Sequence, residues 1–167
     1  HGRNDFNTER NNMNMAIGHS DDIDSIDAAT ALIQQCRQQL SGQVPVAGLL
    51  FAGIGYEHGL ILAAIQDAWP DLPLIGCTTD GEFSTVQGYS NDSVVLSLFW
   101  GPGLEAKVGL GRNLSEGIEE ATEQAIAQAR GARTDSPAIC LTTPESMTAN
   151  CTDIVEKLQA VLGNACP

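Results

Sequence analysis

The spacing of apolar residues predicts amphipathic helices in four stretches of the chain, where such residues recur at steps of three and four. The predicted helices cover residues 21–40, 60–69, 113–130 and 151–162. Ser20 and the aspartates that follow it supply an N-cap and negative charge at the start of the first helix. Asn113 and Glu116 have the spacing of a capping box at the start of the third. Pro70 ends the second helix and Gly163 ends the fourth.

Short, continuous apolar runs predict strands that are buried on both faces. These runs are residues 46–52, 73–77 and 138–141. Two further apolar segments, residues 93–100 and 104–112, are joined only by Gly101-Pro102-Gly103. Because so short a glycine-rich connection joins antiparallel neighbours, the two segments are predicted to form a hairpin.

The order of these elements predicts an α/β fold with a mixed, mostly parallel sheet, a central antiparallel hairpin and helices packed on the faces of the sheet. No internal repeat is evident. We expect a single domain over residues 21–167, incomplete at its C-terminus because nothing after Gly163 closes the architecture. Residues 1–20 are polar and rich in asparagine, and we interpret them as a disordered leader or a remnant of the expression vector.

Composition narrows the classes of partner. Eight basic against 21 acidic residues give a net charge of −13, which would repel nucleic acid and anionic membranes. No stretch approaches the roughly 20 apolar residues of a membrane span. The five cysteines are widely spaced and show no metal-ligand spacing. These features predict a cytoplasmic protein that binds neither nucleic acid nor membrane and carries no metal or cofactor.

The most informative segment is the turn after the strand at residues 73–77, because it combines two glycines with a thiol, two hydroxyls and two carboxylates. Ligands of open α/β sheets bind beyond the carboxyl ends of the parallel strands. The residues predicted to bind a ligand are Gly76, Cys77, Thr78, Thr79, Gly81, Glu82, Tyr56 and Thr143. A tight turn whose hydroxyls satisfy local backbone groups remains the alternative.

A catalytic interpretation of the same turn would make Cys77 a nucleophile and His58 its base. Asp80 and Glu82 oppose it, because nearby carboxylates raise the pKa of a thiol. We favour a buried, inert Cys77 and predict no catalytic residue. Asp80 is interpreted as a turn residue, whereas the sequence does not decide whether Glu82 is a surface charge or a functional carboxylate.

Residues 74–84 (LIGCTTDGEFS), followed by residues 93–96 (SVVL), resemble the N-terminal part of the FIST sensory domain, whose hallmark is a Gly-Cys-(Ser/Thr)-Thr-x-Gly-Glu turn. The resemblance covers residues 23–167. It implies an intracellular ligand-sensing module of signal transduction that binds a small molecule such as an amino acid, with Glu82 suited to a ligand ammonium. It also implies a C-terminal partner domain that is absent from this chain.

A third interpretation is an interaction module without a ligand of its own. An uncovered sheet edge with free N–H and C=O groups invites pairing with another chain. We therefore expect self-association, most simply as a homodimer.

Overall fold

The computed structural model describes residues 12–133, 135, 137–145, 147–163 and 166. They fall into two compact units that divide after Ala106, where the sequence had suggested one domain. We call residues up to 106 unit 1 and residues 107–167 unit 2. The α/β class with a mixed sheet is confirmed. None of the described helices is long and apolar enough to cross a membrane.

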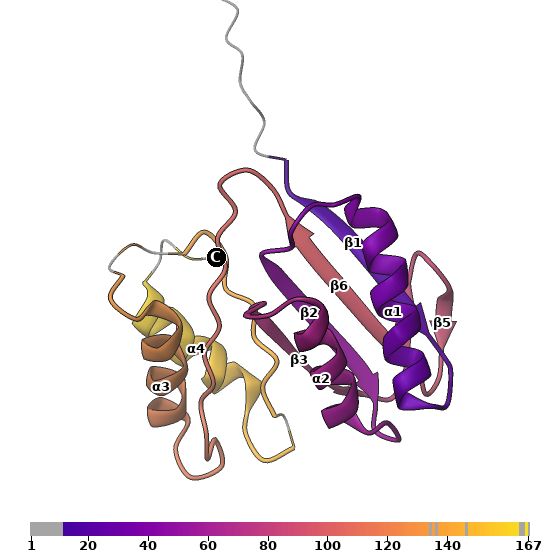
Figure 1. The fold of residues 1–167 in the computed structure, drawn as a ribbon. Coiled ribbons are helices and arrows are strands. Elements are labelled where there is room, and N and C mark those ends of the chain that lie inside the picture. Colours follow the sequence, from indigo (N-terminus) through magenta and orange to yellow (C-terminus); the bar gives the residue numbers. More distant parts are fainter. Residues whose placement is uncertain (1–11, 134, 136, 146, 164–165, 167) are drawn as a thin grey trace, which may run out of the picture. The chain divides into compact units, whose positions relative to one another are not determined.

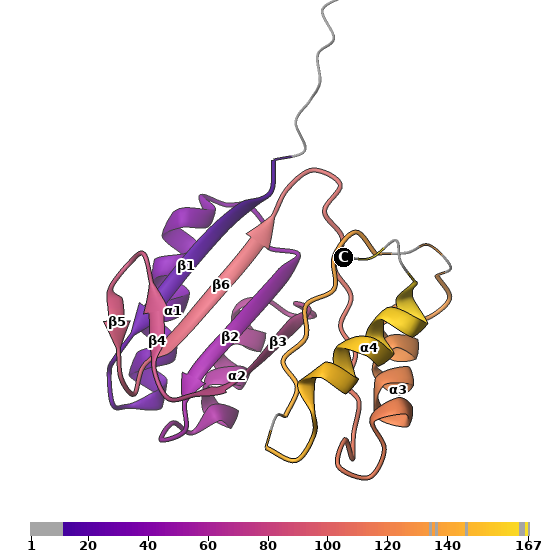
Figure 2. The ribbon, with the colours of Figure 1, turned by 180° about the vertical axis from the view of Figure 1, so that it is seen from behind.

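Unit 1 contains a four-stranded sheet in the order β1-β6-β2-β3 and a two-stranded hairpin sheet, β4-β5 (Figures 1 and 2). Its elements are β1 (Asn14–Ser20), α1 (Ser25–Leu40), β2 (Ala47–Gly53), α2 (His58–Ala68), β3 (Leu74–Thr79), β4 (Glu82–Ser84), β5 (Gly88–Ser90) and β6 (Val94–Trp100). Strand β6 runs antiparallel to both β1 and β2, whereas β2 and β3 are parallel. The ends of β2 and β3 therefore meet at one edge of the sheet.

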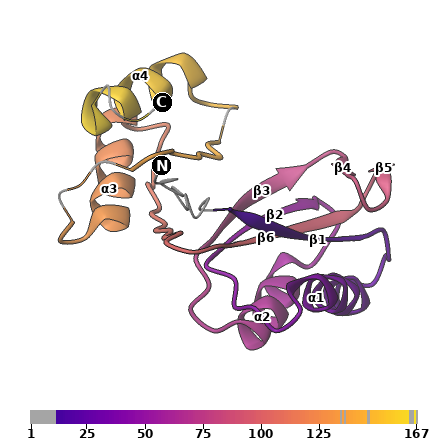
Figure 3. The ribbon, with the colours of Figure 1, turned by 90° about the horizontal axis from the view of Figure 1, so that it is seen from above.

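Helices α1 and α2 cover one face of this sheet (Figure 3). Alternation along the strands sends Ala16, Leu50, Leu96 and Leu98 into the core beneath them. Asp24 caps α1 by accepting the N–H groups of the first turn. The helices thus pack on one face of the sheet only, and the β4–β5 hairpin lies on the other side.

Residues 14–20 form strand β1, so their assignment to a disordered leader was wrong. The sequence pattern did not predict this strand, because one of its two edges is bonded by side chains of α1 and not by a neighbouring strand. The amide groups of Gln35 and Gln39 bond the backbone N–H and C=O of His19 and Ile17, with N–H to Oε1 distances of 2.9 and 3.1 Å. Between them, Gly18 packs against Leu32, whose carbonyl oxygen would lie 2.6 Å from an added Cβ.

The predicted hairpin of residues 93–100 and 104–112 is not formed. β6 is in place, but β1 and β2 occupy both of its edges, which leaves no edge for residues 104–112. The structure assigns no strand to residues 104–112 or to the predicted strand at 138–141. The glycine-rich connection instead forms a turn in which the Leu104 N–H donates to the Gly101 carbonyl.

Unit 2 contains α3 (Ile118–Arg130) and α4 (Cys151–Leu162), and α4 has the bounds predicted from the sequence. α3 begins later than predicted, because residues 113–117 form a turn instead of a capping box. The extended segment of residues 107–112 lies against α3: the N–H groups of Leu110 and Arg112 donate to Gln128 and Gln124, each at 2.9 Å. Cys140 packs with apolar residues of α3 and α4.

Candidate functional site

The polar turn after β3 lies where the sequence placed it, at the edge where two parallel strands end. Gly53, the last residue of β2, is in register with Thr79, the last residue of β3. Gly76, Cys77 and Thr78 are exposed. The expectation of a buried Cys77 was wrong, because β3 is the outer strand of the unit 1 sheet. A ligand could therefore reach backbone, thiol and hydroxyl groups along this stretch.

Glu82 lies beneath the turn and is only 4 % exposed. Thr79 donates its hydroxyl hydrogen to Oε1, and the Ser93 hydroxyl and N–H both donate to Oε2, the latter at 3.0 Å. Both carboxylate oxygens are thus used within the protein. This geometry makes Glu82 a brace that ties the end of β3 to the start of β6, and its burial leaves little of the carboxylate within reach of a ligand ammonium.

The brace continues into β1 through His19, a buried residue that the sequence analysis had excluded with the leader. Its Nε2 lies 3.0 Å from the Ser93 Oγ and its Nδ1 lies 2.7 Å from the Ser84 Oγ. Since Ser93 donates its hydroxyl hydrogen to Glu82, it accepts from an Nε2–H of His19. In the neutral imidazole, Nδ1 then accepts from the Ser84 hydroxyl, which completes the chain.

Burial lowers the pKa of His19, while the negative charges of Glu82 and Asp21 act in the opposite direction. Burial thus favours the neutral imidazole, for which the proton positions above hold. The network of Glu82, Ser93, His19 and Ser84, with Thr79 at one end, is called the buried polar chain below. It joins β1, β3, β4 and β6 under the exposed turn.

Tyr56 and His58, both considered from the sequence, serve the loop after β2. The buried Tyr56 places its hydroxyl 2.8 Å from the carbonyl oxygens of Asp22 and Asp92. The Nε2 of His58 lies 3.1 Å from the Gly53 carbonyl oxygen. Among the described residues no hydrogen bond joins His58 to Cys77, so the geometry gives no support to a thiol–imidazole pair.

The hairpin that follows the turn presents an aromatic pair. Phe83 and Tyr89 lie opposite each other in the β4–β5 ladder, and both are exposed. The Tyr89 ring closely approaches Gly81, where an added Cβ would lie 2.6 Å from the phenolic oxygen. Gly81 therefore allows the ring to pack over the turn, which supports a structural role for this predicted site residue.

Thr143, the remaining predicted site residue, belongs to unit 2 and is half-buried. The predicted polar run around it extends to Ser146, which lies outside the described residues. Among the described residues, no group of three or more His, Cys, Asp or Glu side chains could hold a metal ion.

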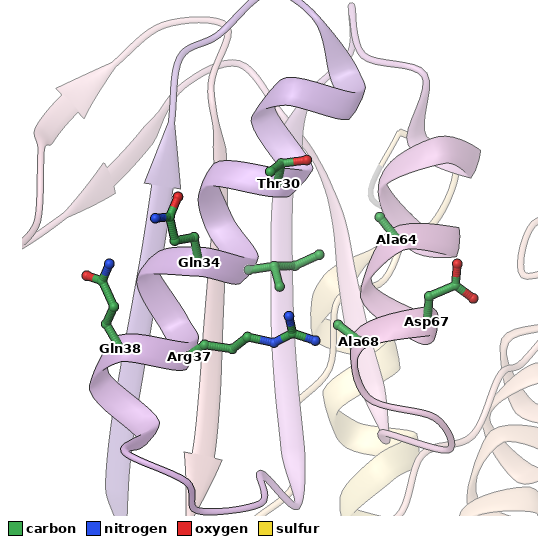
Figure 4. A pocket seen from close by; sticks show the side chains of 8 residues that line it. Thr30, Gln34, Arg37, Gln38, Ala64, Asp67 and Ala68 are labelled. Carbon is green, nitrogen blue, oxygen red and sulfur yellow. The ribbon is translucent and has the colours of Figure 1, made fainter.

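A wide, open groove of about 720 Å³ lies between α1 and α2, on the side of unit 1 that carries the helices (Figure 4). Thr30, Gln34, Arg37 and Asp67 are among its lining residues. It includes no residue of the polar turn. Its walls are mostly the outer faces of two surface helices. We therefore assign the candidate site to the strand ends and take control substitutions from the groove.

His19, Ser84 and Ser93 were missed because each reads as an ordinary polar residue of a turn or tail. Their role depends on contacts between segments that are distant in sequence. One local signal was available: the alternation of Ala16, Gly18 and Ser20 with larger side chains is that of a strand with one face against a helix.

A family model described as the FIST N domain matches residues 46–167 of the chain. The match covers the polar turn, the hairpin, β6 and all of unit 2. It begins after β1 and α1, so His19 lies outside it. No curated protein matches the chain.

Proposed function

Because the chain belongs to the FIST N domain family, a family of sensory domains associated with signal transduction, we propose that it binds a small molecule at the exposed end of β3. The ligand contacts in this proposal are the backbone of Gly76, the side chains of Cys77 and Thr78, and the outer side of Thr79. An amino acid is the ligand class that we propose, in keeping with the family's sensory role.

One observation carries this assignment: exposed polar groups stand on a buried, fully bonded support. Gly76 to Thr78 are open to solvent, whereas the carboxylate behind them is held by Thr79 and Ser93. Such pre-organisation lowers the cost of ordering the site when a ligand binds. Glu82 in this proposal positions Thr79 and does not contact the ligand.

The setting that we propose is the cytoplasm, where a longer signalling protein would join this domain to a C-terminal partner domain. The exposed free thiols of Cys77 and Cys151 support a reducing compartment. The acidic surface disfavours nucleic acid as the partner.

The test is a calorimetric and NMR titration with the common amino acids and other small metabolites. Thr78→Val keeps the shape of the side chain but removes its hydroxyl, and we expect at least about a fivefold weaker affinity for the ligand found, the effect of one lost hydrogen bond. Thr30→Val is the matched control in the α1–α2 groove and should leave binding unchanged. Binding that responds to Thr30→Val, or no binding of any compound, would contradict the proposal.

A further inference from the structure

The turn between β4 and β5 is held by Ser84, the residue at one end of the buried polar chain. The Oγ of Ser84 accepts the N–H groups of Val86 and Gln87, at 3.2 and 3.3 Å. Its hydroxyl hydrogen is donated to the Nδ1 of the neutral His19, 2.7 Å away. Because a hydroxyl has one hydrogen and two lone pairs, these three bonds use all of its capacity. The hydrogen bonds of the hairpin turn therefore fit a neutral His19.

A second proton on the His19 ring disturbs this arrangement at one point. Nδ1 becomes a donor, so three N–H groups face the two lone pairs of the Ser84 oxygen. The Ser84 hydroxyl hydrogen loses its acceptor at the same time, and this residue is buried, so water does not readily replace the lost bond. The Nε2–H group donates to Ser93 in both states of the ring. Protonation therefore acts on the hairpin turn and not on the start of β6.

Two carboxylates are the charged groups that act on His19 among the described residues. Glu82 of β4 and Asp21, before α1, both favour the imidazolium, while burial favours the neutral ring and has the larger effect on the pKa of His19. β6 presents an uncharged hydroxyl to this residue, and α1 presents the amide of Gln35. Tyr56 lies near the same two carboxylates and stays neutral, because burial raises the pKa of its hydroxyl. His19 is therefore the group of this cluster whose charge changes as the pH falls below neutrality.

The hairpin that carries this turn is tied to the ligand site proposed above. β4 begins at Glu82, which holds Thr79 at the end of β3. β5 carries Tyr89, whose ring packs over Gly81 in the turn between β3 and β4. The hairpin ladder has only three residue pairs, and so short a hairpin is not stable without anchors outside it. Loss of the Ser84 anchor therefore loosens the support of the exposed turn.

We infer that His19 is a positioning residue that makes ligand binding at the end of β3 depend on pH, an inference that rests on the proposed function. With His19 neutral, Ser84 holds the hairpin turn, and the exposed turn keeps its binding form. With His19 protonated, the hairpin turn is released, and ligand binding has to order it again, which lowers the affinity. The ligand is thus held at neutral pH and released on acidification. His19 lies on β1, before the region that the family model matches, so the preceding strand supplies this pH dependence.

An NMR titration of the chain without ligand, from neutral pH downwards, tests the first step. The ring signals of His19 and the amide signals of Val86 and Gln87 should shift with one common midpoint. His19→Gln keeps one donor and one acceptor but takes up no proton, so this variant should lose the common shift. His58→Gln is the matched control and should keep it, because His58 bonds the Gly53 carbonyl outside the buried polar chain.

The unmodified chain decides this step even where His19→Gln does not fold. Amide signals of Val86 and Gln87 that do not follow the ring of His19 would overturn the inference. A His19 that stays neutral until the chain unfolds would also overturn it, as would the same amide shifts in a folded His19→Gln.

Calorimetric titration with the common amino acids, each tested singly, tests the second step. Histidine is left out because its own side chain titrates in this range. At pH values on either side of the His19 midpoint, the affinity should differ by about fivefold or more, with the weaker binding on the acidic side. His58→Gln should show the same difference and His19→Gln none.

An affinity that does not change with pH in the unmodified chain would overturn the inference, and so would an equal change in His19→Gln. If no amino acid binds at either pH, the proposed function fails by itself. The titration without ligand then still supports or overturns the control of the hairpin by His19.

Discussion

Unit 1 and unit 2 use the same strand–helix contact, but they differ in what stands on the other edge of the strand. In unit 1, β6 pairs with both β1 and β2, and its Val94, Leu96 and Leu98 fill the core under the helices. In unit 2 the segment of residues 107–112 is bonded to Gln124 and Gln128 of α3, but no strand lies beside it among the described residues. The difference teaches that glutamine side chains can satisfy one edge of an extended segment, whereas a sheet forms only where a strand satisfies the other.

The candidate site follows from the completed sheet. Ser93 immediately precedes β6, and its N–H and hydroxyl hold Glu82. His19 comes from β1 and receives its hydrogen bonds only because β6 brings Ser93 beside it. The buried polar chain is therefore a product of strand pairing in unit 1, and unit 2 has no counterpart of it in its described residues.

The largest expected effect comes from the glycines that define the shared contact. Gly18→Val should destabilise unit 1 and Gly111→Val should destabilise unit 2, each by about 3 kcal/mol, because a side chain there meets helix backbone. Both tryptophans, Trp69 and Trp100, lie in unit 1, so their fluorescence in urea reports on unit 1 alone, while circular dichroism reports on both units.

Gly59→Ala is the control for these variants, since open space surrounds that glycine in α2. It should cost nothing, because alanine favours the helix. Equal loss of tryptophan signal in Gly18→Val and Gly111→Val would show that the units do not unfold separately, and a neutral Gly18→Val would contradict the close contact itself.

Glu82→Gln should lower the unfolding free energy by about 2 kcal/mol, because the amide replaces a charged acceptor that holds two donors from Ser93 and one from Thr79. Urea denaturation monitored by tryptophan fluorescence measures the change. Asp80→Asn, an exposed neighbour in the same turn, should change stability little. A Glu82→Gln variant as stable as the natural chain would mean that the carboxylate is not the brace we describe.

The glutamine pairs give a smaller effect. Replacing both Gln35 and Gln39 by alanine should cost about 2 kcal/mol, roughly 1 kcal/mol for each edge position that loses its bonds. The corresponding change at Gln124 and Gln128 should cost less, since each accepts one hydrogen bond instead of taking part in two or more. Gln34→Ala, on the exposed side of α1 (Figure 4), is the control, and a loss equal to that of the pair would refute the role of the edge contacts.

The smallest effect is a dependence on pH. Because burial holds the pKa of His19 below its ordinary 6.5, the unfolded chain binds a proton more readily than the folded one. Stability from this group is complete above pH 6.5 and falls as the pH drops through and below that value. His19→Gln should remove this part of the curve in urea titrations at several pH values. An unchanged dependence of stability on pH in the variant would show that a group other than His19 takes up the proton.

Much of the fold could be predicted from local patterns. α1, α2 and α4 follow from helical spacing and end signals, and β2, β3 and β6 follow from short apolar runs. The polar turn could be located too, because strand-end glycines and hydroxyls are local features. These elements share one property: the residues that specify them are close in sequence.

The parts that could not be predicted depend on partners far away in the chain. β1 contains His19 and Gly18, which are favourable only against Ser84 and Ser93, 65 and 74 positions from His19, and against α1. Residues 104–112 have the composition of a strand, but β1 and β2 occupy both edges of β6, with which these residues were predicted to pair. The burial of Glu82 likewise depends on β6. The sequence of the turn alone therefore did not show whether this carboxylate is a surface charge or a buried group.

Residue-resolved amide hydrogen exchange of the dilute chain tests the relation between the two units most directly. The account predicts protected amides at Ile17, His19, Leu110 and Arg112, because all four are bonded to glutamine side chains. It predicts a protected Gly18 beside β6 and a rapidly exchanging Gly111 with no strand beside it. Equal protection of Gly18 and Gly111, or rapid exchange at Leu110 and Arg112, would contradict the claim that both units use the same glutamine contact and that only unit 1 has a strand on the other side of the bonded segment.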